Sequence, residues 1–319
     1  MTSCSADALA AHEPLAGTAP SATAWIVIEQ AGPWGREALL DSHLDDTVGR
    51  HLATAKGTGV TALLARHPDR PQKAANAERN VWIARSAPGG MLLRHGLMAD
   101  VAEIADWDLA AIGAGQLPAF GTINRRPLTL VCTHSGRDLC CAVHGRALYN
   151  ELIGRAPAHL RPLLWESSHI GGHRFAPVSL TLPSGAVHGR LDLATATAVL
   201  ERAPLGEVVL DSLRGRSSLL PPCQVATIEV QRRYSVRVLD DLDVLRVVDD
   251  RVVPVPPGST LPPGQRHVAA EVRHRDGRVW RATLVARDLD RPRLESCGKE
   301  PVAGIVWTCV ELEATAPWA

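Results

Sequence analysis

One order of expected strands and helices occurs twice along the chain, and this repeat limits the fold more than any other feature. In the first copy, a strand, a helix and a second strand precede a strand pair and a closing helix. Apolar periodicity places them at 25–29, 36–55, 60–66, 81–86, 91–97 and 101–112. The second copy has the same order, at 128–133, 141–155, 162–168, 177–183, 186–191 and 192–203. Few residues are identical between the copies, so only the element order repeats.

Strand–helix–strand followed by a hairpin and a helix is the plan of a thioredoxin-like α/β layer. We therefore expect an α/β fold with two tandem thioredoxin-like units and a smaller C-terminal α+β domain. The predicted divisions are an N-terminal arm at 1–22, a first unit without metal ligands at 23–120, a second unit at 121–214 and the C-terminal domain at 215–319. In that last domain, Asp276-Gly277 between alternating apolar residues predicts a hairpin.

Composition limits the partners and the compartment. The formal net charge is zero, which gives no reason to expect nucleic acid or an acidic membrane surface as a partner. No apolar run approaches the roughly 20 residues that span a bilayer, and the N-terminus does not resemble a signal peptide. We expect a cytoplasmic protein, in which the seven cysteines stay reduced.

Thiols and imidazoles gather in two short stretches, CTHSGRDLCC (132–141) and HIGGH (169–173). Cys132 ends one predicted strand and Cys141 opens the next helix, where the helix N-terminus favours a thiolate. His169 and His173 follow the neighbouring strand. These four side chains are expected to converge and to hold either a zinc ion or a [2Fe–2S] cluster.

The joint pattern C-x8-C followed by H-x3-H-R-F resembles the signature of the sucrase/ferredoxin-like family of thioredoxin-like ferredoxins. EPLAGTAP (13–20) and GPWG (32–35) are also similar to bacterial members, and the resemblance covers most of 13–205. It implies a [2Fe–2S] cluster held by two cysteines and two histidines. Matched to this chain, the cluster and metal ligands are Cys132, Cys141, His169 and His173.

The leading hypothesis is accordingly a Rieske-like electron carrier or redox sensor with a redox protein, a reductase or an electron acceptor, as its partner. We expect a carrier rather than a catalyst, and no pair of carboxylates suggests glycoside hydrolysis. The alternative is a Cys2His2 zinc-binding module with a structural role. Thiol–disulfide chemistry at Cys140 and Cys141 is a weaker third hypothesis, because the C-x-x-C spacing is absent.

Several nearby residues fall outside the family pattern. Arg137 is expected to donate hydrogen bonds near the cluster, and His134 and His144 to lie at the surface or in hydrogen bonds. The remaining cysteines are interpreted as packing residues or, for Cys4, as part of the N-terminal arm; they are Cys4, Cys223, Cys297 and Cys309.

Cys140 provides a test of Cys141 as a ligand, because a shift of one residue in the family alignment would make Cys140 the ligand instead. Replacing Cys140 with serine is expected to leave the cluster content unchanged, since the family spacing selects Cys141. Iron content and visible absorption of the purified variant measure this. A colourless, iron-free Cys140→Ser protein would show that Cys140 is the ligand instead.

Overall fold

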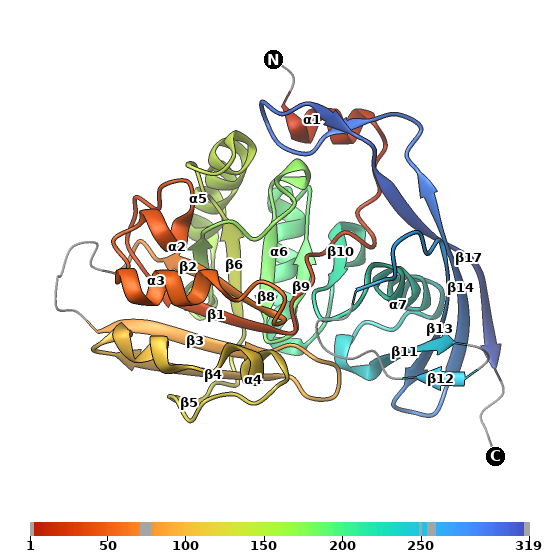
Figure 1. Ribbon diagram of the computed structural model, residues 1–319, viewed down its shortest axis with the longest axis horizontal. Helices are drawn as coiled ribbons and strands as arrows, with labels where there is room; N and C mark the ends of the chain where they lie inside the picture. Colours follow the sequence, from red (N-terminus) through yellow and green to blue (C-terminus); the bar gives the residue numbers. More distant parts are fainter. Residues whose placement is uncertain (1–2, 71–77, 249–250, 254–259, 316–319) are drawn as a thin grey trace.

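The computed structural model describes residues 3–70, 78–248, 251–253 and 260–315 of the chain. Its main body is a single ten-stranded mixed sheet, and a five-stranded antiparallel sheet stands beside it (Figure 1). A third, two-stranded sheet lies near the N-terminal helix.

The first thioredoxin-like unit supplies five strands of the large sheet and a set of short helices. In chain order they are β1 (Ala24–Glu29), α2 (Ala38–Asp41), α3 (Asp46–Ala53), β2 (Val60–Arg66), β3 (Arg79–Arg85), β4 (Leu92–Met98), η1 (Val101–Asp106), α4 (Leu109–Gly113) and β5 (Thr122–Ile123). β1 pairs parallel with β2 and antiparallel with β3, which in turn pairs with β4.

The second unit repeats this arrangement. Its elements are β6 (Leu128–Cys132), the π-helical turn η2 (Cys141–Gly145), α5 (Arg146–Arg155), η3 (Arg161–Leu163), β7 (Leu164–Ser167), η4 (His173–Phe175), β8 (Ser179–Leu182), β9 (Ala186–His188), α6 (Leu193–Arg202), η5 (Ala203–Leu205), η6 (Leu210–Ser212) and β10 (Leu213–Arg216). β6 pairs parallel with β7 and antiparallel with β8, which pairs with β9. The expected boundary at 214–215 falls inside β10, which extends the large sheet beyond β9.

The C-terminal part forms the smaller antiparallel sheet with one long helix. Its elements are α7 (Pro221–Tyr234), η7 (Leu239–Asp241), β11 (Leu242–Val248), β12 (Arg251–Val253), β13 (His267–His274), β14 (Val279–Asp288), β15 (Arg293–Leu294), β16 (Pro301–Val302) and β17 (Ile305–Thr315). The predicted Asp276-Gly277 hairpin joins β13 to β14. The three parts together confirm the predicted fold class.

Two of the expected helices are divided, and part of the expected N-terminal arm is helical. The segment 36–55 is divided into α2 and α3, because the Asp45 carboxylate accepts hydrogen bonds from the Thr47 and Val48 amides and starts a new helix. The segment 101–112 is divided into η1 and α4. Within the expected arm, residues 1–2 lie outside the described residues, and Cys4–Ala10 forms the helix α1.

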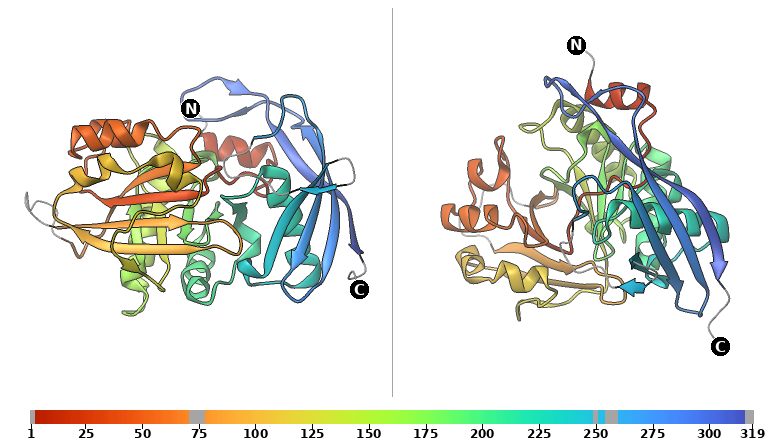
Figure 2. Two further views of the ribbon diagram at one scale, coloured as in Figure 1. Left: turned by 60° about the horizontal axis from the view of Figure 1, so that its bottom comes forward. Right: turned by 45° about the vertical axis from the view of Figure 1, so that its right-hand side comes forward.

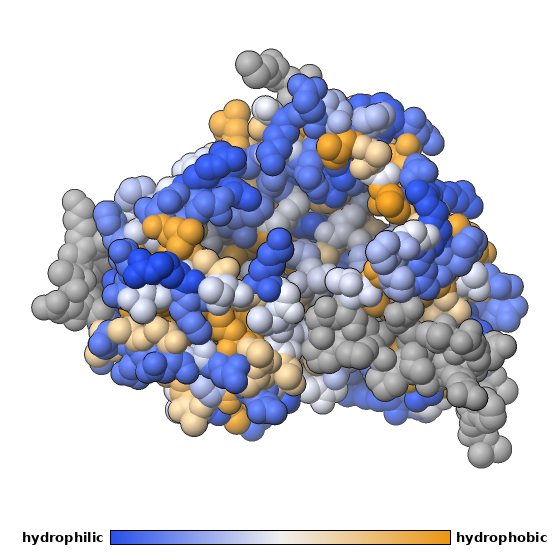
Figure 3. All heavy atoms as spheres, in the orientation of Figure 1, coloured by the Kyte–Doolittle hydropathy of each residue, from blue (hydrophilic) through white to orange (hydrophobic). Residues whose placement is uncertain are grey.

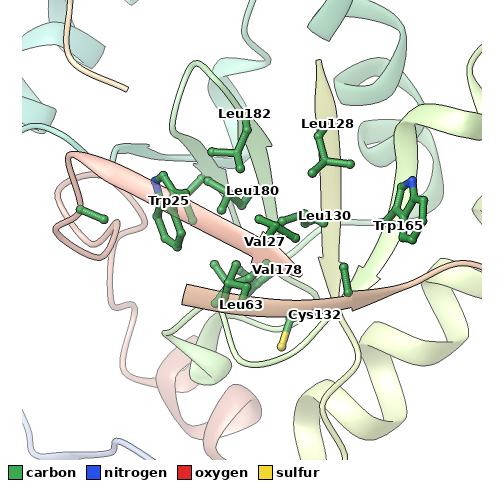
Figure 4. Packing of buried hydrophobic residues seen from close by; sticks show 14 of the residues in the cluster. Trp25, Val27, Leu63, Leu128, Leu130, Cys132, Trp165, Val178, Leu180 and Leu182 are labelled. Carbon is green, nitrogen blue, oxygen red and sulfur yellow. The ribbon is translucent and has the colours of Figure 1, made fainter. Parts of the chain in front are cut away.

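The two units share one hydrophobic core. Along β1, Trp25 and Val27 face this core, whereas Ile26 and Ile28 face the helices of the first unit. Strands β6 and β8 of the second unit contribute to the same core (Figure 4), with Leu128, Leu130, Cys132, Leu180 and Leu182. Cys132 thus lies at the end of a core built by both units.

The surface contrasts with this core. On the face shown in Figure 3, most atoms belong to hydrophilic residues, and apolar residues form small separate groups. Among the helices in the described part of the chain, none is both long and apolar enough to cross a bilayer.

Leu130 is fully buried in this shared core, whereas Leu205 is 65% exposed. Replacing Leu130 with alanine is expected to lower the free energy of unfolding by about 2–5 kcal/mol, because the cavity is only partly refilled. Leu205→Ala is the control and should change it by less than about 0.5 kcal/mol. Denaturant unfolding measures both, and equal effects of the two variants would contradict the shared core.

Candidate metal centre

Cys132 and Cys141 lie at the two ends of the loop that follows β6. Cys132 is the last residue of β6, and Cys141 is the first residue of η2, which leads into α5. Each residue is only 1% exposed. The loop returns to the sheet so that both thiols lie at the carboxyl end of β6, shielded from water.

Gly145 allows the helix to approach the strand this closely. A Cβ atom at Gly145 would lie 2.1 Å from the Cys132 carbonyl oxygen, so any larger residue must push the helix away. Residues 141–145 form a π-helical turn, a rare distortion that is frequent at functional sites. The glycine therefore fixes the position of Cys141 relative to Cys132.

The segment 169–173, called the histidine loop below, follows β7 and is held by a buried arginine. Gly171 and Gly172 have φ values of +108° and +73°, which favour glycine. Arg214 of β10 donates to the Gly171 carbonyl at 2.9 Å and lies where a Cβ of Gly172 would be. Arg214 is only 2% exposed, and burial lowers its pKa to about 9. It is therefore a buried cation beneath the histidine loop.

The structure brings three of the four predicted ligands together. Ligand atoms of Cys132, Cys141 and His169 all lie within 4.8 Å of one another. The His169 Nδ1 atom is buried and has no hydrogen-bond partner among the described residues. Two buried thiols beside a buried nitrogen without a partner fit the ligand set of a zinc ion or an iron–sulfur cluster.

His173 lies beside this group. Its ring centre is 5.1 Å from that of His169, and its Nδ1 atom lies 2.9 Å from Oδ2 of Asp138. A carboxylate only accepts hydrogen bonds, so Nδ1 carries a proton toward Asp138, and Nε2 is the ring nitrogen that a metal would use. Burial raises the pKa of Asp138. Hydrogen bonds from His173 and from the backbone amides of Cys140 and Cys297 lower this pKa by a larger amount, so the net shift is downward.

The pKa shifts of the two thiols run opposite to the sequence-based expectation. The pKa of Cys132 is well below its ordinary value, because Cys141 donates a hydrogen bond to it and the His169 imidazole and the His134 backbone amide favour its charge. The pKa of Cys141 is raised by the same hydrogen bond and by burial. The hydrogen bond therefore favours negative charge on Cys132 rather than at the helix start, and a bound metal would displace the proton that this bond contains.

The other residues singled out around the loop have different positions. Arg137 contacts Glu37 of the first unit instead of the thiols. His134 is 2% exposed and its Nε2 atom lies 2.8 Å from the Gly35 carbonyl oxygen, whereas His144 is exposed. The expectation of hydrogen bonding is thus met at His134, and the GPWG loop of the first unit supports the cysteine loop.

Three supporting residues were not predicted as part of the site: Asp138, Glu13 and Arg214. The Glu13 carboxylate is 1% exposed and binds Arg174, next to His173, at 2.9 Å. The Arg214 guanidinium donates to the Thr18 hydroxyl at 3.1 Å. Glu13 and Thr18 both belong to EPLAGTAP, so this distant segment secures the histidine loop from outside.

His169 is the predicted ligand nearest to open space. It is partly exposed and lines a pocket of about 320 Å³ together with residues of the first unit. Charged neighbours in this pocket include Arg36, Glu37 and Arg137. The cluster of Cys132, Cys141 and His169 is thus reached from the pocket through the His169 imidazole rather than through a thiol.

Fold and site together define a thioredoxin-like protein with a cysteine–histidine centre. The sucrase/ferredoxin-like family profile matches residues 15–215, which is more than half of the 319-residue chain, and the chain belongs to this family. Searches among curated proteins and among solved structures found no match.

Two glycines provide a matched test of the helix position. Gly145→Ala is expected to lower metal content and thermal stability, because its Cβ would overlap the Cys132 carbonyl. Gly154→Ala, later in the same helix, meets nothing within 4 Å and should stabilise the protein by about 0.5–1 kcal/mol. Metal analysis and thermal unfolding of both variants measure this, and unchanged metal content in Gly145→Ala would refute the role of close packing.

Proposed function

We propose that the protein carries a [2Fe–2S] cluster on Cys132, Cys141, His169 and His173, and that it acts in electron transfer or redox sensing. The observation that carries the proposal is the convergence of Cys132, Cys141 and His169 in a chain of the sucrase/ferredoxin-like family. A cluster with this ligation supplies one-electron redox chemistry.

Each ligand is prepared by its surroundings. The hydrogen bond from Cys141 lowers the pKa of Cys132, and a bound metal would displace the proton in that hydrogen bond. Asp138 contacts the Nδ1 atom of His173 rather than Nε2, and the His169 Nδ1 atom has no hydrogen-bond partner within the described part of the chain. Two cysteines and two histidines are the ligand types of Rieske centres.

The charges around the ligands indicate in which direction the reduction potential is shifted. Two neutral imidazoles in place of two thiolates remove negative charge, which raises the potential above that of all-cysteine ferredoxins. Arg214 is a buried cation that interacts electrostatically with Cys141. Burial excludes water that would screen this charge, so Arg214 favours the reduced state further.

We also propose that the partner is a redox protein, a reductase or an electron acceptor, that approaches at His169. The two thiols are buried, whereas His169 lines the pocket beside Arg36 and Arg137. Of the four predicted ligands, His169 is the one that lines this pocket, so the electron would leave through its imidazole. The charged residues at the pocket rim then orient the partner.

A structural zinc ion is the second candidate. Ligand atoms of Cys132, Cys141 and His169 that lie within 4.8 Å of one another suit a single tetrahedral ion, and the residue types are those that zinc prefers. Such an ion would tie the cysteine loop to the histidine loop without redox chemistry. Iron content and colour separate the two candidates.

Protein purified without oxygen is expected to contain about two irons per chain and, after reduction, to give an EPR signal with an average g value below that of the free electron. Cys132→Ser should abolish both, because it removes a ligand. Cys309→Ser is the control and should retain both, since Cys309 lies in β17, outside either group of clustered cysteines. Metal analysis and EPR of the three proteins are the measurements.

Colourless protein with zinc that is lost in Cys132→Ser would instead establish the zinc site and reject electron transfer. Retention of two irons in Cys132→Ser would reject the ligand assignment itself. The Cys309→Ser control separates loss of a ligand from a general effect of removing a thiol.

A further inference from the structure

Three cysteines outside the predicted ligand set form a second group. The Sγ atoms of Cys4, Cys140 and Cys297 form a nearly equilateral triangle, with sides of 3.4, 3.4 and 3.5 Å. Oδ1 of Asp138 lies 3.7 Å from the Cys4 sulfur, and ligand atoms of all four residues lie within 4.8 Å of one another. The triangle thus has a carboxylate at its side.

The three thiols come from remote parts of the chain. Cys4 opens α1, Cys140 ends the cysteine loop, and Cys297 follows β15 in the segment between β14 and β17. Figures 1 and 2 both show α1 beside this C-terminal segment, and α1 packs against β15 and η4. Cys4 and Cys140 are 0% and 2% exposed, whereas Cys297 is partly exposed.

Other contacts hold these segments in place independently of the thiols. The Asp7 carboxylate in α1 accepts hydrogen bonds from Arg291 at 3.0 Å and from the Leu294 backbone amide at 2.6 Å. Arg293 binds the buried Glu13 carboxylate at 3.1 Å. The thiol triangle is therefore preorganised by the ion pairs around it.

Packing and disulfide formation explain the triangle poorly. The sulfurs are too far apart for a bond of about 2.05 Å, and any disulfide between two of them would leave the third unpaired. A polynuclear cluster is also a poor fit, because different metal atoms hold its cysteines and separate them more widely. A single thiophilic ion would contact all three sulfurs at once.

We propose that Cys4, Cys140 and Cys297 bind one zinc ion, with Oδ1 of Asp138 as the fourth ligand. Three thiolates and one carboxylate form a closed tetrahedral set typical of structural zinc. A Zn–S distance of about 2.3 Å separates the sulfurs by about 3.8 Å, so the triangle needs to widen only slightly. Oδ2 of Asp138 already has three partners, His173, Ser296 and the Cys297 amide. Oδ1 accepts one backbone hydrogen bond, from the Cys140 amide at 2.8 Å, and a second lone pair remains for the metal.

This ion would clasp the N-terminal helix and the C-terminal segment onto the cysteine loop. Asp138 links the two centres, because its Oδ2 atom orients His173, a predicted ligand of the first centre. The second centre does not depend on which metal the first centre holds, since the two share no ligand. It assigns a role to Cys4 and Cys297, which the sequence placed in an arm and among packing residues.

Zinc and iron analysis of the full chain, purified without oxygen, tests the proposal. Cys297→Ser is expected to lose one zinc per chain and to retain the metal of the first centre. Its affinity for added zinc, measured by competition with a colorimetric chelator, should fall at least about a hundredfold, because a direct ligand is lost. Cys297 lies outside the large sheet, so this replacement spares the main fold.

Cys140→Ser should lose the same zinc, whereas Cys309→Ser should retain it. Cys132→Ser should lose the metal of the first centre and keep this zinc, which separates failure of this inference from failure of the proposed function. Full zinc content in Cys297→Ser would overturn the proposal. Wild-type protein without this zinc, with free thiols or a disulfide detected by mass spectrometry, would overturn it as well.

Discussion

The antiparallel contact between β2 and β7 is the joint on which the rest of the molecule depends. It merges two thioredoxin-like sheets into one and places the buried Glu166 carboxylate at the junction. Glu166 accepts from Arg66 of the first unit at 3.1 Å, from Arg146 of α5 at 2.7 Å and from the Thr133 hydroxyl at 2.6 Å. A buried carboxylate with three charged or polar partners fixes the cysteine loop, the helix and both sheets relative to one another.

The joint also gives the first unit a role beside the metal centre, although it contributes none of the predicted ligands. The Ser168 amide, next to His169, donates to the Leu64 carbonyl oxygen of β2 at 2.8 Å. At the other loop, a Cβ on Gly136 would lie 1.8 Å from the Gly35 carbonyl oxygen. Backbone of the first unit therefore supports both ligand-bearing loops of the second, and the histidine and cysteine loops are held against one scaffold.

The chain ends add a third layer to this arrangement. Segments from the N-terminus and from the region between β14 and β17 meet over the cysteine loop, where Asp138 contacts His173 on one side and the amides of Cys140 and Cys297 on the other. Parts of the chain that are far apart in sequence thus enclose the first centre. Cys4 and Cys297, for example, are separated by 293 positions. Enclosure of this kind lowers the local dielectric constant and strengthens the charges that act on a bound metal.

The sequence by itself determined the order of strands and helices in both units and which cysteines and histidine would lie close together. Periodicity predicted both strand–helix–strand units, and the spacing of Cys132, Cys141 and His169 predicted three groups that the structure brings together, because strand ends and the following loops are local features. Only the tertiary structure decided that the two units share one sheet, that the Cys141 thiol donates a hydrogen bond to Cys132, and that Cys4 meets Cys297. Those outcomes depend on contacts between segments far apart in the chain, and no local pattern encodes such distances.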